Sequence, residues 1–134
     1  MLPLSYPRRW RFASILLLVS VLTLAIVPAI WLWPQDPATV WRLSDKWLHG
    51  LTFAVLALWF SGQYAREAYW KLALGLLAFG ALIEVCQRMI SYRTAEWNDL
   101  LADLLGIVVG LLIASLGAGG WSMRIEKQLQ NRIG

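Results

Sequence analysis

Charged residues are scarce in this 134-residue chain. They make up 15% of its positions, against 59% for hydrophobic residues. Because about 25% charged residues is usual for soluble domains, this balance excludes an ordinary soluble domain. It indicates an integral membrane protein whose core forms by packing of helices in lipid.

Cysteine and histidine are nearly absent as well. Cys86 is the only cysteine, so no intrachain disulfide can form, and on a helical wheel it points away from Glu84, as a packing thiol would. The chain lacks an HExxH or phosphatase motif, so no metal site and no cofactor are predicted. Its net charge of +4 is distributed as membrane topology requires, and no nucleic-acid partner is expected.

Long apolar runs are what the chain does have. Residues 12–33 form 22 consecutive uncharged positions, about 33 Å of helix, which is enough to cross a hydrocarbon core of about 30 Å. This run is too long for a signal peptide and lacks a small-x-small cleavage site, so we expect a retained anchor. Three further helices are predicted at about residues 47–62, 71–90 and 98–117. The predicted fold class is an all-α membrane protein with four transmembrane helices.

The tryptophans and basic residues predict the boundaries and the orientation. Eight of nine tryptophans fall near predicted helix ends, and only Trp41 lies within a predicted loop. The positive-inside rule places both termini in the cytoplasm of a multi-pass inner-membrane protein. The cytoplasmic side then collects Arg8, Arg9, Arg11, Arg66, Lys71, Arg124, Lys127 and Arg132, and the outer side has Arg42, Lys46, Arg88 and Arg93.

Three segments follow from this orientation. Residues 1–11 form a basic cytoplasmic N-terminus, residues 12–117 the membrane domain and residues 118–134 a cytoplasmic tail. Ile125, Leu129 and Ile133 are four residues apart in the tail, which would let it lie on the inner membrane surface. A frayed tail is the alternative.

Polar residues recur at helical spacing where three of the predicted helices reach the outer side. Within each helix they are three or four positions apart and so share one face. From the helical rise, Glu84 and Asp103 both lie about 10 Å below the outer boundary of the hydrocarbon. The predicted polar cluster consists of Asp45, Lys46, His49, Glu84, Gln87, Arg88, Arg93, Asp99 and Asp103.

These residues are expected to face one another or a wet pocket. A charged side chain at a helix centre costs about 2.5 to 3.5 kcal/mol on insertion scales, so a cluster facing lipid would be hard to retain. Gly106 and Gly110 form a small-xxx-small pattern that lets two helices approach closely, and Gly80 offers the same one turn before Glu84.

The order and spacing of these motifs resemble those of the VanZ-like family, named after a teicoplanin-resistance protein. The resemblance covers about residues 45–113 and consists of the series Asp45-Lys46-x-x-His49, Glu84-x-x-Gln87, Arg93 and Asp99-x-x-x-Asp103-x-x-Gly106-x-x-x-Gly110. It implies a cell-envelope membrane protein, linked in some members to reduced sensitivity to glycopeptide antibiotics. Where the family usually has asparagine, this chain has Asp103, which adds a titratable group.

Each motif also has a purely structural interpretation. Ser44 or Asp45 would cap the second helix, His49 would be a hydrogen-bonded packing residue, and Glu84 would pair with Arg88. Under this hypothesis the cluster only holds helices together.

Three roles remain open at this stage. The first is binding or modifying a lipid-linked envelope component, such as a cell-wall intermediate, at an outer-leaflet pocket. The second is a membrane-embedded acid/base or metal-assisted enzyme acting on an envelope lipid, in which Glu84 and Asp103 exchange protons with His49. The third is the structural role. Membrane lipids are expected partners, and the sequence allows an oligomer.

Overall fold

The computed structural model describes the backbone of residues 1–31, 40–90 and 97–134, and the side chains of residues 1–26, 47–89 and 98–134. Within these residues every regular element is helical, which confirms the predicted all-helical fold. The elements in chain order are α1 (Pro7–Trp31), α2 (Val40–Ser61), the 3₁₀ turn η1 (Arg66–Ala68), α3 (Tyr69–Ile90), α4 (Trp97–Ile113), the π-helical turn η2 (Ala114–Ala118) and α5 (Trp121–Ile133).

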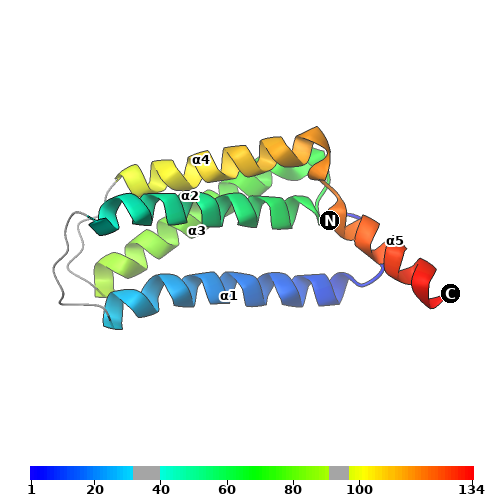
Figure 1. Cartoon of the computed structure of the whole chain (residues 1–134), viewed down its shortest axis with the longest axis horizontal. Coiled ribbons are helices and arrows are strands. Elements are labelled where there is room, and N and C mark those ends of the chain that lie inside the picture. The colour runs from blue at the N-terminus through cyan, green and yellow to red at the C-terminus, as the bar shows by residue number, and fades with distance from the viewer. Residues whose placement is uncertain (32–39, 91–96) are drawn as a thin grey trace.

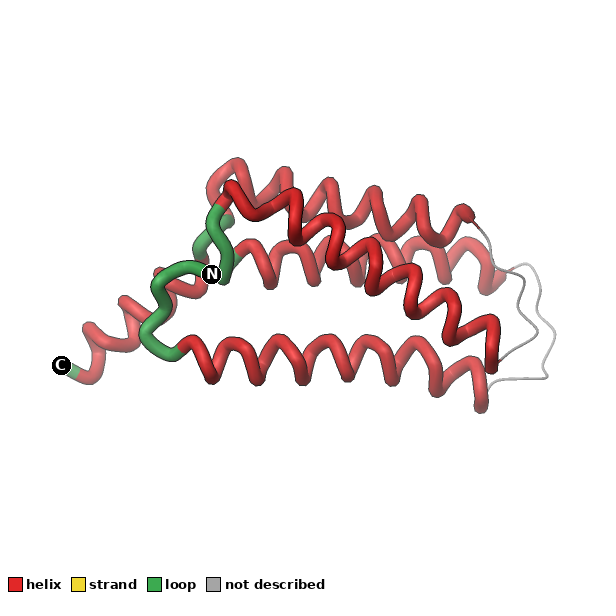
Figure 2. The backbone as a smooth tube through the Cα atoms, turned by 180° about the vertical axis from the view of Figure 1, so that it is seen from behind, coloured by secondary structure: helices red, strands yellow, loops and turns green. Residues whose placement is uncertain are grey.

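Helices α1 to α4 lie alongside one another, and α5 projects from one end of the bundle (Figure 1). Both chain termini lie at that end, which we call the terminal end; the opposite end is the distal end. Successive helices alternate in direction, so α2 and α4 are parallel, and these two form the most extensive helix pair. Helix α3 runs obliquely, starting beside α4 at the terminal end and finishing beside α1 at the distal end (Figure 2).

Helix α2 starts earlier than predicted. It begins at Val40, so Ser44 and Asp45 lie inside the helix and neither caps it. Trp41, which was expected in a loop, lies in its first turn. The physical reason is that no proline or glycine lies between Val40 and Trp47, so nothing interrupts the helix there.

The chain after η2 differs from one of the two predictions made for the C-terminal tail. Residues Trp121–Ile133 form a regular helix, so the frayed tail is wrong. A sharp turn separates α4 from α5. Gly117 and Gly120 in this turn have φ of 141° and 69°, a backbone region that residues with a Cβ rarely adopt.

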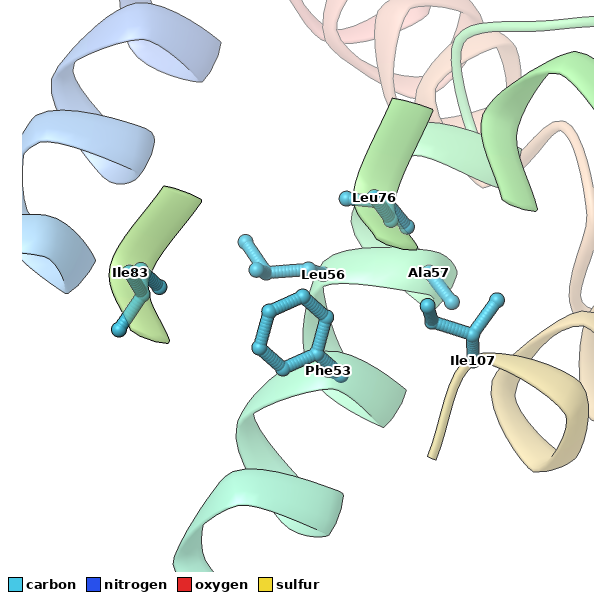
Figure 3. Close-up of a cluster of buried hydrophobic side chains, with 6 residues drawn as sticks. All are labelled: Phe53, Leu56, Ala57, Leu76, Ile83 and Ile107. Atoms are coloured by element: carbon cyan, nitrogen blue, oxygen red, sulfur yellow. The ribbon is translucent and has the colours of Figure 1, made fainter. Parts of the chain in front are cut away.

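The apolar core lies where α2, α3 and α4 meet (Figure 3). Its fully buried members are Phe53, Leu56, Ala57, Leu76, Ile83 and Ile107. Partly buried side chains of α1 from Leu17 to Ala25 pack against this cluster, so all four long helices contribute to one core.

The outside of the bundle is apolar too. Phe12 is 69% exposed and Leu24 is 72% exposed, and many other large hydrophobic side chains are similarly uncovered. Three described segments are long and apolar enough to cross a membrane, namely Pro7–Ile26, Arg66–Met89 and Asn98–Ala118, and Trp47–Ser61 is apolar but shorter. An apolar surface of this extent suits lipid and not water, so the chain is a membrane protein.

Candidate functional site

The candidate site lies where α2 and α4 are in close contact. A Cβ on Gly106 would overlap the carbonyl of Gly50, and a Cβ on Gly110 would lie 2.6 Å from the carbonyl oxygen of Ala54. The two backbones therefore touch along a strip where α4 has glycine. On α2 the matching small residues are Gly50 and Ala54, a second small-xxx-small pattern that the sequence analysis did not use.

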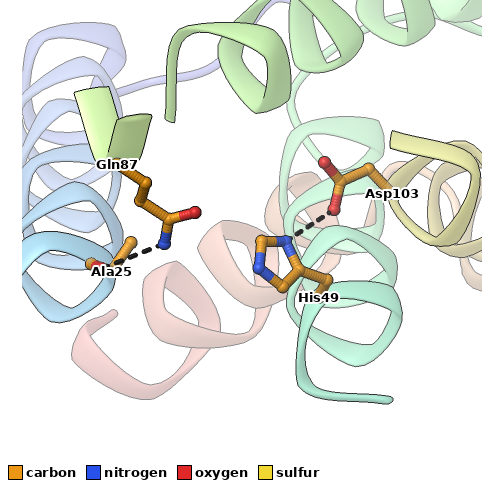
Figure 4. A network of polar contacts seen from close by, with 4 residues as sticks. All are labelled: Ala25, His49, Gln87 and Asp103. Carbon is orange, nitrogen blue, oxygen red and sulfur yellow. Dashed lines mark hydrogen bonds and ion pairs between the residues drawn. The ribbon is translucent and has the colours of Figure 1, made fainter. Parts of the chain in front are cut away.

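At the distal end of this strip the only histidine in the chain faces an aspartate. His49 of α2 and Asp103 of α4 point toward one another, with Nδ1 and Oδ1 3.0 Å apart (Figure 4). Their side chains are 11% and 3% exposed, so the pair lies inside the bundle. An aspartate at this distance holds the imidazole ring in one orientation and leaves carboxylate lone pairs that can accept further donors.

The other oxygen of Asp103 faces α3. A Cβ built on Gly80 would lie 2.6 Å from Oδ2 of Asp103 and 3.2 Å from the ring of Phe53. The carboxylate therefore occupies space that any larger residue at position 80 would take. Through this contact Asp103 lies at the junction of α2, α3 and α4.

Two polar residues extend the site along α3. Glu84 follows Gly80 by one turn and is half-buried. Gln87 is buried, and its Nε2 donates to the carbonyl oxygen of Ala25 on α1 at 3.1 Å (Figure 4). Arg88 is exposed. The polar face of α3 thus connects the α2–α4 pair to α1.

The remaining predicted members divide into two groups. Asp99 is buried one turn before Asp103 on α4. The side chains of Asp45, Lys46 and Arg93 lie outside the described residues. We call the described, at least partly buried members the distal polar cluster, which comprises His49, Glu84, Gln87, Asp99 and Asp103.

The side chains of this cluster are hydrogen-bonding and titratable groups. Carboxylates accept hydrogen bonds from hydroxyl and amine groups, and imidazole both donates and accepts them. Among the described residues, no three histidine, cysteine, aspartate or glutamate side chains are placed to hold a metal ion.

A comparison with protein families identifies the family to which the chain belongs. The family model described as VanZ/LLP1 matches residues 7–118, which contain α1 through η2 and the whole distal polar cluster. The chain belongs to the VanZ/LLP1 family. This result confirms the resemblance to VanZ-like proteins noted in the sequence. No curated protein and no solved structure matches the chain.

A second polar network of this VanZ/LLP1 protein lies at the terminal end, where the sequence analysis placed no site. Ser14 of α1 is buried; its hydroxyl accepts from Trp59 Nε1 at 2.9 Å and from Gln63 Nε2 at 3.0 Å. Trp10, Trp59 and Trp121 pack with ring centroids 5.3 to 5.8 Å apart. These indoles were expected separately at the membrane interface, but the fold gathers them into one cluster.

Glu126 of α5 ties the N-terminal segment into this network. Its carboxylate accepts from the backbone amides of Ser5 and Tyr6 at 2.7 and 3.1 Å, just before α1 begins at Pro7, and from Trp10 Nε1 at 2.8 Å. Burial alone would raise the pKa of Glu126, but the hydrogen bonds from Ser5, Trp10 and Tyr6 outweigh it and lower the pKa below its ordinary value. Glu126 thus acts as a cap for α1 supplied by a distant helix.

Sequence reasoning missed this network because its signals were weak. Ser14 is one of three hydroxyl residues within an apolar run, and Gln63 directly follows a predicted helix end. Glu126 lies outside the residues that match the VanZ/LLP1 family, so no family motif points to it.

Proposed function

We propose that this VanZ/LLP1 protein spans the inner membrane four times and binds the polar part of a lipid-linked envelope component at its distal polar cluster. The length of α2 supports four spans, because its 22 residues form about 33 Å of helix, although its most apolar part is shorter. The side-by-side packing of α1 to α4 and the termini at one end fit two inward and two outward crossings.

The charge distribution supports cytoplasmic termini. Arg66, Lys71 and Arg124 belong to segments at the terminal end, together with the basic residues before α1. Cytoplasmic loops carry an excess of lysine and arginine, so the terminal end belongs in the cytoplasm. The distal polar cluster then lies in the outer half of the membrane, where envelope precursors are exposed.

The observation that carries the proposed binding role is the pairing of His49 with Asp103. An imidazole and a carboxylate 3.0 Å apart and almost fully buried are expensive to place in lipid, and such residues in membrane helices mark binding or transport sites by default. Glu84 lies one turn from Gly80, the residue that Asp103 touches, so further acid is close by. Carboxylates in this arrangement suit hydroxyl or amine groups of a sugar or peptide headgroup.

Arg88 completes the expected recognition. It is exposed on α3, while Arg93, which follows it in the sequence, lies outside the described residues. Guanidinium groups bind phosphate through paired hydrogen bonds. A prenyl-phosphate-linked headgroup would therefore place its phosphate at Arg88 and its sugar at the carboxylates. Binding of such a precursor is how the protein would influence glycopeptide sensitivity.

A second role has its own supporting observation. Gln87 joins α3 to the backbone of α1, and Asp103 contacts both neighbouring helices of α4. Polar contacts between membrane helices stabilise bundles, so the cluster would also serve as interhelical glue. The two roles differ in what conservative substitutions do.

The binding role and the structural role are separated by two variants, Asp103→Asn and Glu84→Gln. The matched control is Glu67→Gln, because Glu67 is an exposed acid at the terminal end. If the cluster binds the precursor, both variants should be as abundant in the membrane as wild type. Mass spectrometry should show that they no longer copurify with the lipid-linked precursor, and the glycopeptide sensitivity of the host should change. Loss of protein from the membrane in both cluster variants would support a purely structural role, in which the cluster only holds the helices together. Unchanged precursor retention in both variants would contradict the binding role.

A further inference from the structure

A pocket opens at the terminal end, the opposite end of the bundle from the distal polar cluster. It is lined by Leu2 of the N-terminal segment, by Tyr64, Ala65 and Arg66 between α2 and α3, by Tyr69 at the start of α3, and by Ser115 and Gly119 after α4. Its volume is about 220 Å³, and it is open to the surroundings. This is room for a small headgroup such as a phosphate with an attached glycerol.

Two guanidinium groups hold the chain after α4, and one of them, that of Arg66, lines the pocket. Arg66 donates to the carbonyl oxygen of Ser115 at 2.8 Å. Arg124 donates to the carbonyl oxygen of Gly117 at 2.7 Å and more weakly to that of Gly119 at 3.4 Å. Two arginines therefore hold the segment between α4 and α5.

The charge around the pocket is positive. Arg66 uses one of its five N–H donors in its bond to Ser115, so donors remain for a ligand. None of the described lining residues is acidic. Of the two acids nearby, Glu126 is engaged with Ser5, Tyr6 and Trp10, and Glu67 is exposed beside Arg66.

The surroundings favour a lipid over a free anion. Trp70 and Leu116, the sequence neighbours of the lining residues Tyr69 and Ser115, are 61% and 87% exposed. Apolar side chains of this exposure on membrane helices face acyl chains, and tryptophan prefers the headgroup level. A molecule with its phosphate at Arg66 would extend its chains over this apolar surface.

We propose that this pocket binds the phosphate headgroup of an anionic phospholipid. Arg66 contacts the phosphate directly, Arg124 adds positive charge and holds the wall, and the tyrosines accept or donate hydrogen bonds to the glycerol. With the orientation proposed above, the lipid belongs to the cytoplasmic leaflet. The binding itself does not depend on that orientation or on the distal polar cluster.

The test uses the purified full-length protein in a non-ionic detergent. Equal amounts of phosphatidylglycerol and phosphatidylcholine are added, and retained lipids are counted by native mass spectrometry. Wild type is expected to retain one phosphatidylglycerol in preference to phosphatidylcholine. Arg66→Ala should weaken this retention about tenfold or more, because a hydrogen bond between charged groups is lost. Arg132→Ala, at the far end of α5, is the control for charge and should change nothing.

A second variant is needed because Arg66 also bonds to Ser115, so Arg66→Ala could lose lipid simply by misfolding. Ala65→Leu adds bulk at the pocket wall without removing charge, and it should reduce retention while leaving the unfolding temperature unchanged. Equal retention by wild type, Arg66→Ala and Ala65→Leu would overturn the proposal, as would equal retention of the two lipids. Displacement of the lipid by millimolar inorganic phosphate would assign the pocket to a free anion and overturn the lipid assignment.

Discussion

The carboxylate of Asp103 lies against Gly80 so closely that a Cβ at position 80 would be 2.6 Å from Oδ2. The same carboxylate is 3.0 Å from His49 through its other oxygen. Glycine at position 80 thus makes room on α3 for a charged group carried by α4. This relationship connects helix packing to the chemistry of the distal polar cluster.

Replacing Gly80 with alanine should disturb the cluster without unfolding the bundle. The new methyl group would push the flexible carboxylate aside and lengthen its contact with His49. We expect Gly80→Ala to reduce precursor retention about as much as Asp103→Asn does, with normal abundance. Gly75→Ala on the same helix is the control, because no described atom lies within 4 Å of a Cβ there. Equal retention by both glycine variants would contradict this reading of the contact.

The α2–α4 contact should be far less tolerant. In Gly106→Ala the methyl group would overlap the backbone carbonyl of Gly50, which cannot rotate away as a side chain can. We expect a loss of about 1 to 3 kcal/mol in the free energy of unfolding, as for overpacked cores. Thermal unfolding in detergent measures it against Gly75→Ala. A Gly106→Ala protein as stable as Gly75→Ala would show that the two helices can separate easily.

Gln87 should matter mainly for the position of α1. Its hydrogen bond to the carbonyl oxygen of Ala25 is one of the polar links between α3 and α1 among the described residues. Gln87→Leu keeps the size and apolar packing but removes the bond, so we expect a loss of about 0.5 to 1 kcal/mol. Cross-linking of cysteines placed on α1 and α3 should become less efficient. Unchanged cross-linking would mean that apolar contacts alone position α1.

The terminal end should respond to acid through Glu126. Because the pKa of Glu126 in the folded protein is lowered, its contribution to stability is complete above the unfolded value of about 4.5 and is lost as pH falls through the folded value. Tryptophan fluorescence from Trp10 and Trp121 should change over this acidic range in wild type. Glu126→Gln should lose about 1 to 3 kcal/mol at neutral pH and should not show the acid transition. An identical transition in Glu126→Gln would assign it to another group.

Much of the membrane fold was predictable because its signals are local. Apolar runs, their lengths and the GIVVG pattern of Gly106 and Gly110 lie within single helices. The spacing of His49, Glu84 and Asp103 also indicated which helix faces carry polar groups. The pairing of His49 with Asp103 depends on the register of α2 against α4, which is a tertiary property.

The terminal end was not predictable for the same reason. Glu126 lies 120 residues after Tyr6 in the chain, and nothing in the tail indicates that its acid would cap α1. The earlier start of α2 had a readable signal, which was the absence of proline and glycine between Pro37 and Trp47. The polarity of Ser44 to Lys46 obscured that signal, because polar residues before an apolar run also look like a cap.

The most direct test of the account is the accessibility of position 84 in intact cells. Glu84→Cys is made in a Cys86→Ser chain and treated with a membrane-impermeant maleimide added outside. We expect labelling from the outside, because the distal polar cluster would lie in the outer half of the membrane. Labelling only from the cytoplasmic side would contradict the proposed orientation and, with it, the proposed binding of an envelope precursor.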